Sequence, residues 1–88
     1  MKAKLIVKNI YRIDNKTILE VDSISEGIIK LYTIYNLSNK FNIRLNNFDI
    51  LNNKNNIFIH PVNNLKLEIQ LIENYKKIEI NDVLIPID

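Results

Sequence analysis

Basic side chains recur at a regular spacing near the start of this 88-residue sequence. Lys4, Lys8 and Arg12 are four residues apart, and Lys2 precedes them in register. Because side chains of an extended strand alternate between its two faces, this spacing predicts that the basic residues share one face. Strand residues four apart lie about 13 Å from each other, far enough to contact successive parts of a nucleic-acid backbone. The sequence therefore predicts a basic stripe that binds nucleic acid.

Two more basic residues have the outward parity of a later strand and are predicted to extend the stripe, namely Lys40 and Arg44. Tyrosines between basic residues suit nucleic acid as well, since bases stack on aromatic rings. The alternative interpretation is a solubilising face whose lysines pair with Glu20, Glu68 or Glu79. Lysines also protect a sheet edge against unwanted pairing.

Residues that could carry catalysis are few. His60 is the single histidine and there is no cysteine, so no zinc site can be completed from these residue types alone. A serine or threonine nucleophile would need a base, and only His60 is available. A chain with one glycine also cannot form a Gly-rich phosphate loop. We therefore expect no catalytic residue, metal or cofactor, and no enzyme activity.

The composition predicts one globular domain over residues 1–88, since 47% of the residues are hydrophobic and 25% are charged. Ile and Leu supply most of the apolar content, and β-branched Ile favours strands. The apolar run at 5–7 is too short for a signal peptide or a membrane span. Together with the lack of cysteine, this favours a cytoplasmic protein without a membrane partner.

Alternating apolar and polar residues predict most of the strands. The clearest alternation is in residues 2–13, where Asn9 is the exception on the apolar face. Asp14, Asn15 and Lys16 predict a turn that joins this strand to the next as a hairpin, since Asp and Asn tolerate a positive φ. Strands are predicted at 2–13, 17–22, 28–35, 40–46, 57–60, 65–71, 78–80 and 83–87, with an exposed loop tip at 52–56 and turns at 36–39 and 81–82. This spacing predicts an all-β fold, a small single-domain and mostly antiparallel β-barrel of about six to eight strands.

The only glycine, Gly27, follows a Ser-x-x-Glu capping box at 23–26. No helical periodicity follows this box, so we expect a corner rather than a helix. Gly27 is predicted to occupy a positive φ at this corner and so to have a structural role.

Four short motifs resemble the second domain of translational GTPases such as elongation factor Tu. They are Ile-Tyr-Arg-Ile at 10–13, Thr-Ile-Leu at 17–19, Gly-Ile-Ile-Lys at 27–30 and Ile-Glu-Ile-Asn-Asp-Val-Leu at 78–84. Asn81 stands where the family usually has a glycine, and Asn tolerates the left-handed conformation. The family's other glycines would fall near Val21 and at Tyr32. The resemblance implies a small closed barrel that acts as a stand-alone binding module and contacts RNA or a ribonucleoprotein.

Protein binding is the alternative function. Ile6 and Ile10 lie among the basic residues of the first strand and would form an apolar face there. Such a face, or an exposed sheet edge, would suit a single protein partner, as in adaptor, immunity or mobile-element inhibitor proteins. A barrel that fails to close would expose edge strands and favour a homodimer.

Overall fold

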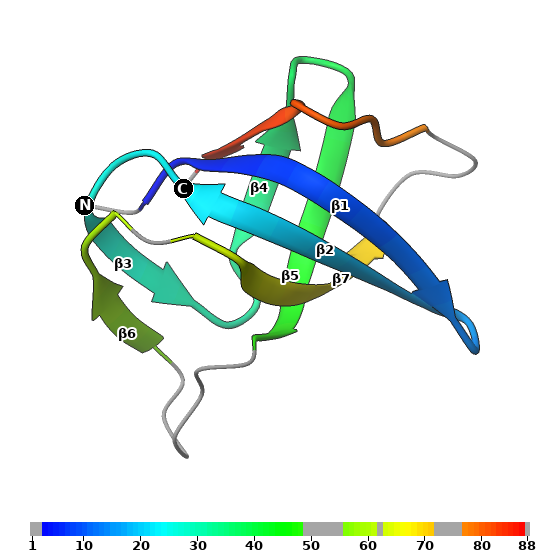
Figure 1. Ribbon diagram of the computed structural model, residues 1–88, viewed down its shortest axis with the longest axis horizontal. Coiled ribbons are helices and arrows are strands. Elements are labelled where there is room, and N and C mark those ends of the chain that lie inside the picture. The colour runs from blue at the N-terminus through cyan, green and yellow to red at the C-terminus, as the bar shows by residue number, and fades with distance from the viewer. Residues whose placement is uncertain (1–2, 49–55, 62, 72–76, 88) are drawn as a thin grey trace.

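The structure is a computed structural model that describes residues 3–48, 56–61, 63–71 and 77–87 (Figure 1). All regular elements in these ranges are strands. They are β1 (Leu5–Ile13), β2 (Lys16–Ser23), β3 (Gly27–Lys30), β4 (Ile34–Leu37), β5 (Phe41–Phe48), β6 (Asn56–Ile59), β7 (Leu65–Leu71) and β8 (Val83–Pro86). The predicted all-β fold is confirmed.

Six of these strands close into an antiparallel barrel in the order β1-β2-β7-β5-β4-β8. The barrel closes where Leu84 of β8 pairs with both Leu5 of β1 and Leu37 of β4. All three side chains are fully buried in the core. The contact between β1 and β8 is short, with only two registered residue pairs. The predicted barrel is therefore confirmed, and its closure depends on a small number of residues.

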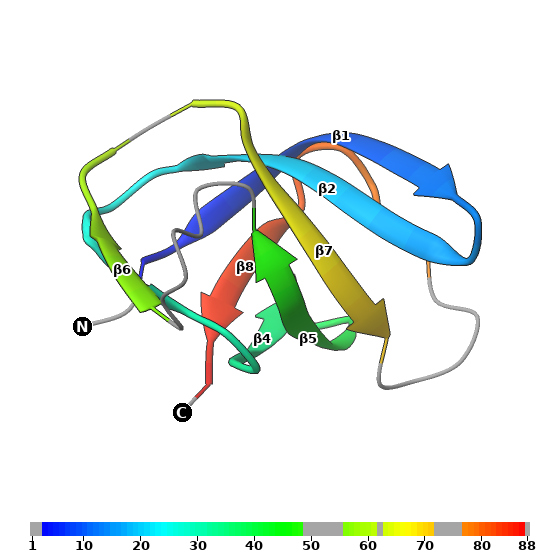
Figure 2. The ribbon, with the colours of Figure 1, turned by 90° about the horizontal axis from the view of Figure 1, so that it is seen from below.

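The remaining strands, β3 and β6, form a two-stranded sheet beside one end of the barrel (Figures 1 and 2). Ile29 and Ile59, one from each strand, are buried in the same hydrophobic core as the barrel residues. The first described residue, Ala3, donates its backbone N–H to the carbonyl of Ile28 at 3.1 Å. The small sheet is thus tied both to the core and to the chain that leads into β1.

The β1–β2 hairpin forms as its turn residues predict. Asp14 and Asn15 have φ values of 50° and 67°, the two positive values of a type I′ turn. Such a turn matches the right-handed twist of the two strands that it joins. Asn81 also adopts a left-handed φ of 74°, in the turn that precedes β8.

Two predicted strands differ from the structure. The predicted strand at 28–35 is divided into β3 and β4, which belong to different sheets. The division falls at Tyr32, whose φ of 65° is incompatible with a strand. The predicted strand at 78–80 is irregular, and Ile80 is exposed. In both places the apolar residues favour a strand, but a turn within or beside the segment interrupts it.

A β-bulge changes the faces of β1. The register shifts between Val7, which pairs with Val21, and Asn9, which pairs with Glu20. The extra residue is Lys8, so side chains beyond it change parity relative to those before it. Ile6 is on the outer face, as predicted, whereas Ile10 packs against the core, so the predicted apolar face that combines the two residues is wrong. The bulge also explains why Asn9 interrupts the apolar alternation.

Gly27 begins β3 and is buried, paired with Ile59. Its φ of 157° lies at the extended limit of the positive range. The predicted corner is confirmed, since residues 24 and 25 form a bend and Gly27 has a positive φ, and the burial of Gly27 is a second constraint. Lys2 and most of the predicted loop tip at 52–56 lie outside the described residues.

Candidate nucleic-acid interface

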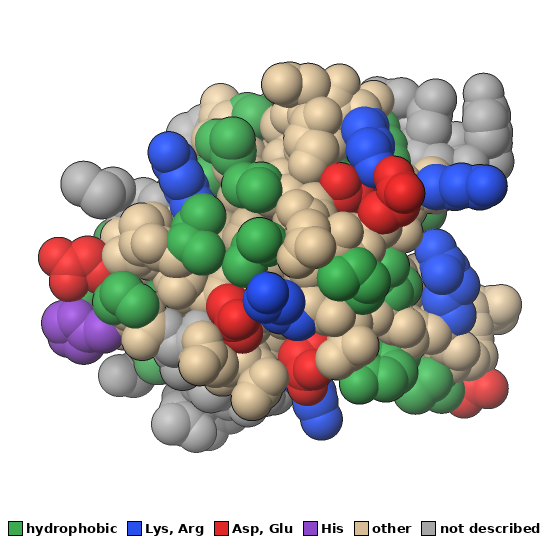
Figure 3. Space-filling view, turned by 45° about the horizontal axis from the view of Figure 1, so that its top comes forward, with side chains coloured by type: hydrophobic (Ala, Val, Ile, Leu, Met, Phe, Trp, Pro, Cys, Tyr) green, Lys and Arg blue, Asp and Glu red, His purple; other side chains and the backbone are tan. Residues whose placement is uncertain are grey.

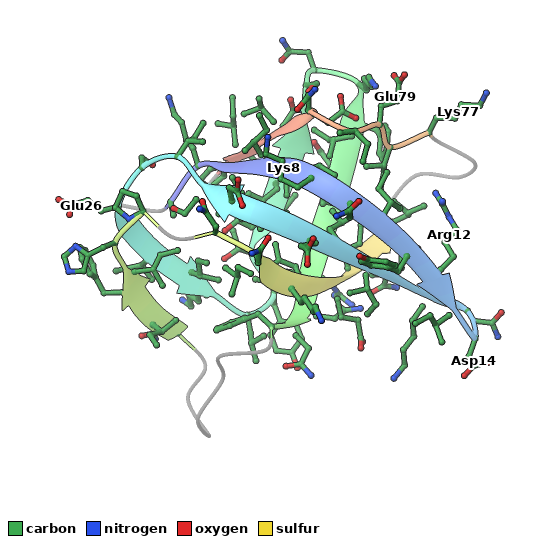
Figure 4. All side chains as sticks on the ribbon, viewed as in Figure 1. Lys8, Arg12, Asp14, Glu26, Lys77 and Glu79 are labelled. Carbon is green, nitrogen blue, oxygen red and sulfur yellow. The ribbon has the colours of Figure 1, made fainter. Side chains whose placement is uncertain are left out.

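Four exposed basic residues lie on this side of the barrel, on or next to β1 or on the chain that leads to β8: Lys4, Lys8, Arg12 and Lys77. We call them the β1 rim. In Figure 4, Lys8 lies midway along β1, and Arg12 and Lys77 project on the same side of the barrel. Lys4 and Lys8 are on the outer face of the barrel. Arg12 lies beyond the bulge and pairs with Thr17, so its side chain has the opposite parity. The predicted single-face stripe is therefore wrong for Arg12, which instead extends the basic surface toward the strand edge.

None of the four rim side chains has an acidic partner among the described residues. The carboxylates that the alternative interpretation assigned to them are engaged elsewhere. Glu20 accepts a hydrogen bond from the Asn9 amide at 2.7 Å, and Glu68 lies 3.7 Å from the Lys16 ammonium. Glu79 binds Lys40 at 2.6 Å. The rim cations are thus available to an anionic ligand.

Lys40 does not belong to this surface. Its ammonium binds Glu79 at 2.6 Å and Asp82 at 3.1 Å. Asp82 is only 7% exposed, and its carboxylate also accepts the backbone N–H of Glu79 at 2.8 Å. The hydrogen bond to Glu79 raises the pKa of the Lys40 ammonium, and Asp82 acts in the same direction. Lys40 therefore fixes the turn before β8, and its predicted place in the basic stripe is wrong.

Arg44 is also apart from the rim. It is on β5, which lies three strands away from β1 in the six-stranded barrel. Its guanidinium donates to the Gln70 side chain and lies 5.7 Å from the centre of the Tyr32 ring. Arg44 thus belongs to a second cluster on the opposite wall.

The surface around the rim is mixed in charge. Figure 3 shows basic and acidic side chains side by side on this face, with several basic side chains toward its right-hand end. Tyr11 is 43% exposed and points outward beside Ile18 of β2. Next to the rim cations it offers an aromatic surface on which a base could stack.

His60 contacts Glu26, with 3.2 Å between Nδ1 and the carboxylate, and both side chains are largely exposed. Among the described residues, no three His, Asp or Glu side chains are grouped as a metal ion would require. Within the same ranges, no helix is long and apolar enough to cross a membrane.

Sequence reasoning missed Lys77 and Tyr32 as members of these clusters. Lys77 is far from β1 in the sequence, and Figure 4 shows it on the same side of the barrel as Arg12. Tyr32 carried one signal, because it falls where the resemblance predicts a glycine. Comparison of the chain with protein-family models, curated proteins and solved structures gave no match.

Proposed function

We propose that this barrel is a non-enzymatic binding module that contacts RNA through the β1 rim. The observation that carries the proposal is that the rim cations have no acidic partner among the described residues, although carboxylates are close by. Ammonium and guanidinium groups that are not paired can replace the counterions of a phosphate backbone, which favours binding of RNA.

The spacing of the rim suits an extended ligand. Lys4 and Lys8 are separated by about 13 Å along the strand, and Arg12 follows at a similar interval. A resemblance to the second domain of translation factors is part of the proposal. It places glycines near Val21 and at Tyr32 and Asn81. Tyr32 and Asn81 have positive φ values of 65° and 74°, whereas Val21 lies within β2.

The test is the salt dependence of binding to a 12-nucleotide single-stranded RNA. The double variant Lys8→Ala/Arg12→Ala should reduce the slope of log affinity against log salt by about 1.4, since each lost phosphate contact contributes about 0.7. The control is Lys30→Ala/Lys66→Ala, which removes the same charge from exposed positions outside the rim. An equal reduction in both variants would contradict a specific rim contact, because net charge alone would then account for binding.

A second candidate function, protein binding by strand addition, is favoured by the free edge of β1. The backbone of Val7 forms hydrogen bonds with Asn81 and Asp82. From Lys8 to the end of β1, no described residue outside β2 forms a backbone hydrogen bond with the strand. In the antiparallel ladder next to the turn, Ile13 and Lys16 form the hydrogen-bonded pair, so the Arg12 amide points to the free edge. An extended segment of a partner protein could pair there.

Two substitutions of the same residue separate the candidates. Arg12→Ala and Arg12→Pro remove the same charge, but only the proline removes the edge N–H. RNA binding should fall equally in both variants, by a few-fold. If a protein partner captured from lysate is held by strand addition, it should survive nuclease and be lost selectively with Arg12→Pro. Retention of that partner by Arg12→Pro would exclude pairing at this edge.

A further inference from the structure

Tyr32 has an unusual conformation for its residue type. It has a φ of 65° in the turn between β3 and β4, and 64% of the residue is exposed. Left-handed conformations are unfavourable for residues with a large side chain and favourable for glycine. An exposed tyrosine at such a position lowers stability and buries little apolar surface in return. Backbone strain of this kind is typical of functional sites.

The Tyr32 side chain is nevertheless positioned. Its backbone N–H donates to the carbonyl of Leu45 at 2.7 Å, which holds the turn against β5. The Arg44 guanidinium lies over the ring at 5.7 Å from its centre, and the Gln70 side chain orients that guanidinium. With one ring face toward Arg44 and most of the residue exposed, the ring presents a flat aromatic surface next to a cation.

A hollow lies beside Arg44 of this pair. It has a volume of about 340 Å³ and is lined by Ile34, Arg44, Gln70 and Leu71. A second hollow of about 260 Å³ shares Gln70 and Leu71 with the first and extends to residues 15–17 of the β1–β2 hairpin. Thr17 in this second hollow is the cross-strand partner of Arg12. The two hollows therefore extend from Arg44, the partner of Tyr32, to the cross-strand partner of Arg12 at the end of the β1 rim.

We propose that Tyr32 is a base-stacking residue, and that the RNA bound by this barrel is single-stranded where it crosses these hollows. The inference rests on the proposed function and names its ligand class. Only an unpaired base can leave its neighbours and stack on a protein ring, whereas duplex bases are stacked on each other. Arg44 would support the stacked base through its charge, and the rim would hold the phosphates.

The decisive variant is Tyr32→Gly. Glycine relieves the left-handed conformation, so the melting temperature should stay equal or rise. Affinity for a 12-nucleotide single-stranded RNA should fall about 5- to 150-fold, the range that corresponds to one stacked base. Phe58→Ala removes another exposed aromatic side chain, 56% exposed on β6, and should leave the affinity unchanged. Tyr32→Phe keeps the ring and should bind nearly as wild type does.

The outcomes separate this inference from the proposed function. If Lys8→Ala/Arg12→Ala weakens binding but Tyr32→Gly does not, the stacking role is overturned and the rim function stands. If the wild type binds no RNA at low salt, both are overturned. Equal affinity for a 12-base-pair duplex, or a lower melting temperature of Tyr32→Gly with unchanged affinity, would also overturn the stacking role. Stability retained with affinity lost is the result that supports it.

Discussion

Leu84→Ala is expected to lower the free energy of unfolding by about 2–5 kcal/mol, because it creates a cavity in a closely packed core. Leu84 is fully buried and pairs with Leu5 on one side and Leu37 on the other. The cavity would therefore form where β8 joins β1 to β4 and closes the barrel. In a domain of this size each kcal/mol corresponds to about 4–8 °C of melting temperature. Thermal unfolding followed by circular dichroism would measure the loss.

The matched control is the next residue of the same strand. Ile85 is 41% exposed on the outer face, so Ile85→Ala should change stability by only about 0.5 kcal/mol. Both variants shorten an aliphatic side chain of equal size and keep the strand. Similar losses for Leu84→Ala and Ile85→Ala would contradict the inward position of Leu84 and the closure of the barrel at β8.

The sequence was sufficient to predict the strands whose alternation is uninterrupted. Residues 41–45 and 65–69 place every second side chain in the core, and the structure buries those side chains. The alternation fails where the backbone geometry changes. The bulge at Lys8 inserts one residue, and the turn at Tyr32 interrupts an apolar run that has the composition of one strand. The bulge depends on the pairing of β1 with β2, and the turn depends on the pairing of β3 and β4 with different strands. Periodicity within one segment does not contain this pairing.

The candidate site was less predictable from the sequence than the strands were. Parity within one strand correctly indicated that Lys4 and Lys8 are on the outer face. It did not indicate which strands are neighbours, so Arg44 was assigned to a surface on the other side of the barrel. Lys40 was assigned as an outward cation, although Asp82 and Glu79, distant in sequence, bind it. Surfaces that combine several strands follow from strand order, which in this barrel is not sequential.

Gly27→Val is expected to lower the free energy of unfolding by about 1–3 kcal/mol, the usual cost of inserting extra atoms into a packed interior. Gly27 is buried and pairs with Ile59 in the small β3–β6 sheet, whose inner side chains are part of the common core. A branched side chain at this position would force β3 away from its neighbours. The expected loss of melting temperature is about 4–24 °C.

Comparison with Gly27→Ala identifies the cause. If positive φ were the main constraint, any Cβ would bring most of the penalty, and Ala and Val would destabilise the protein almost equally. The φ of 157° is positive, in a region that residues with a Cβ rarely adopt, so Gly27→Ala should already lose stability. Because Gly27 is also buried, the loss should grow with side-chain size and be larger for Val than for Ala. Equal losses would show that the corner requires glycine for its backbone, whereas no loss for Val would show that the small sheet is not packed against the barrel.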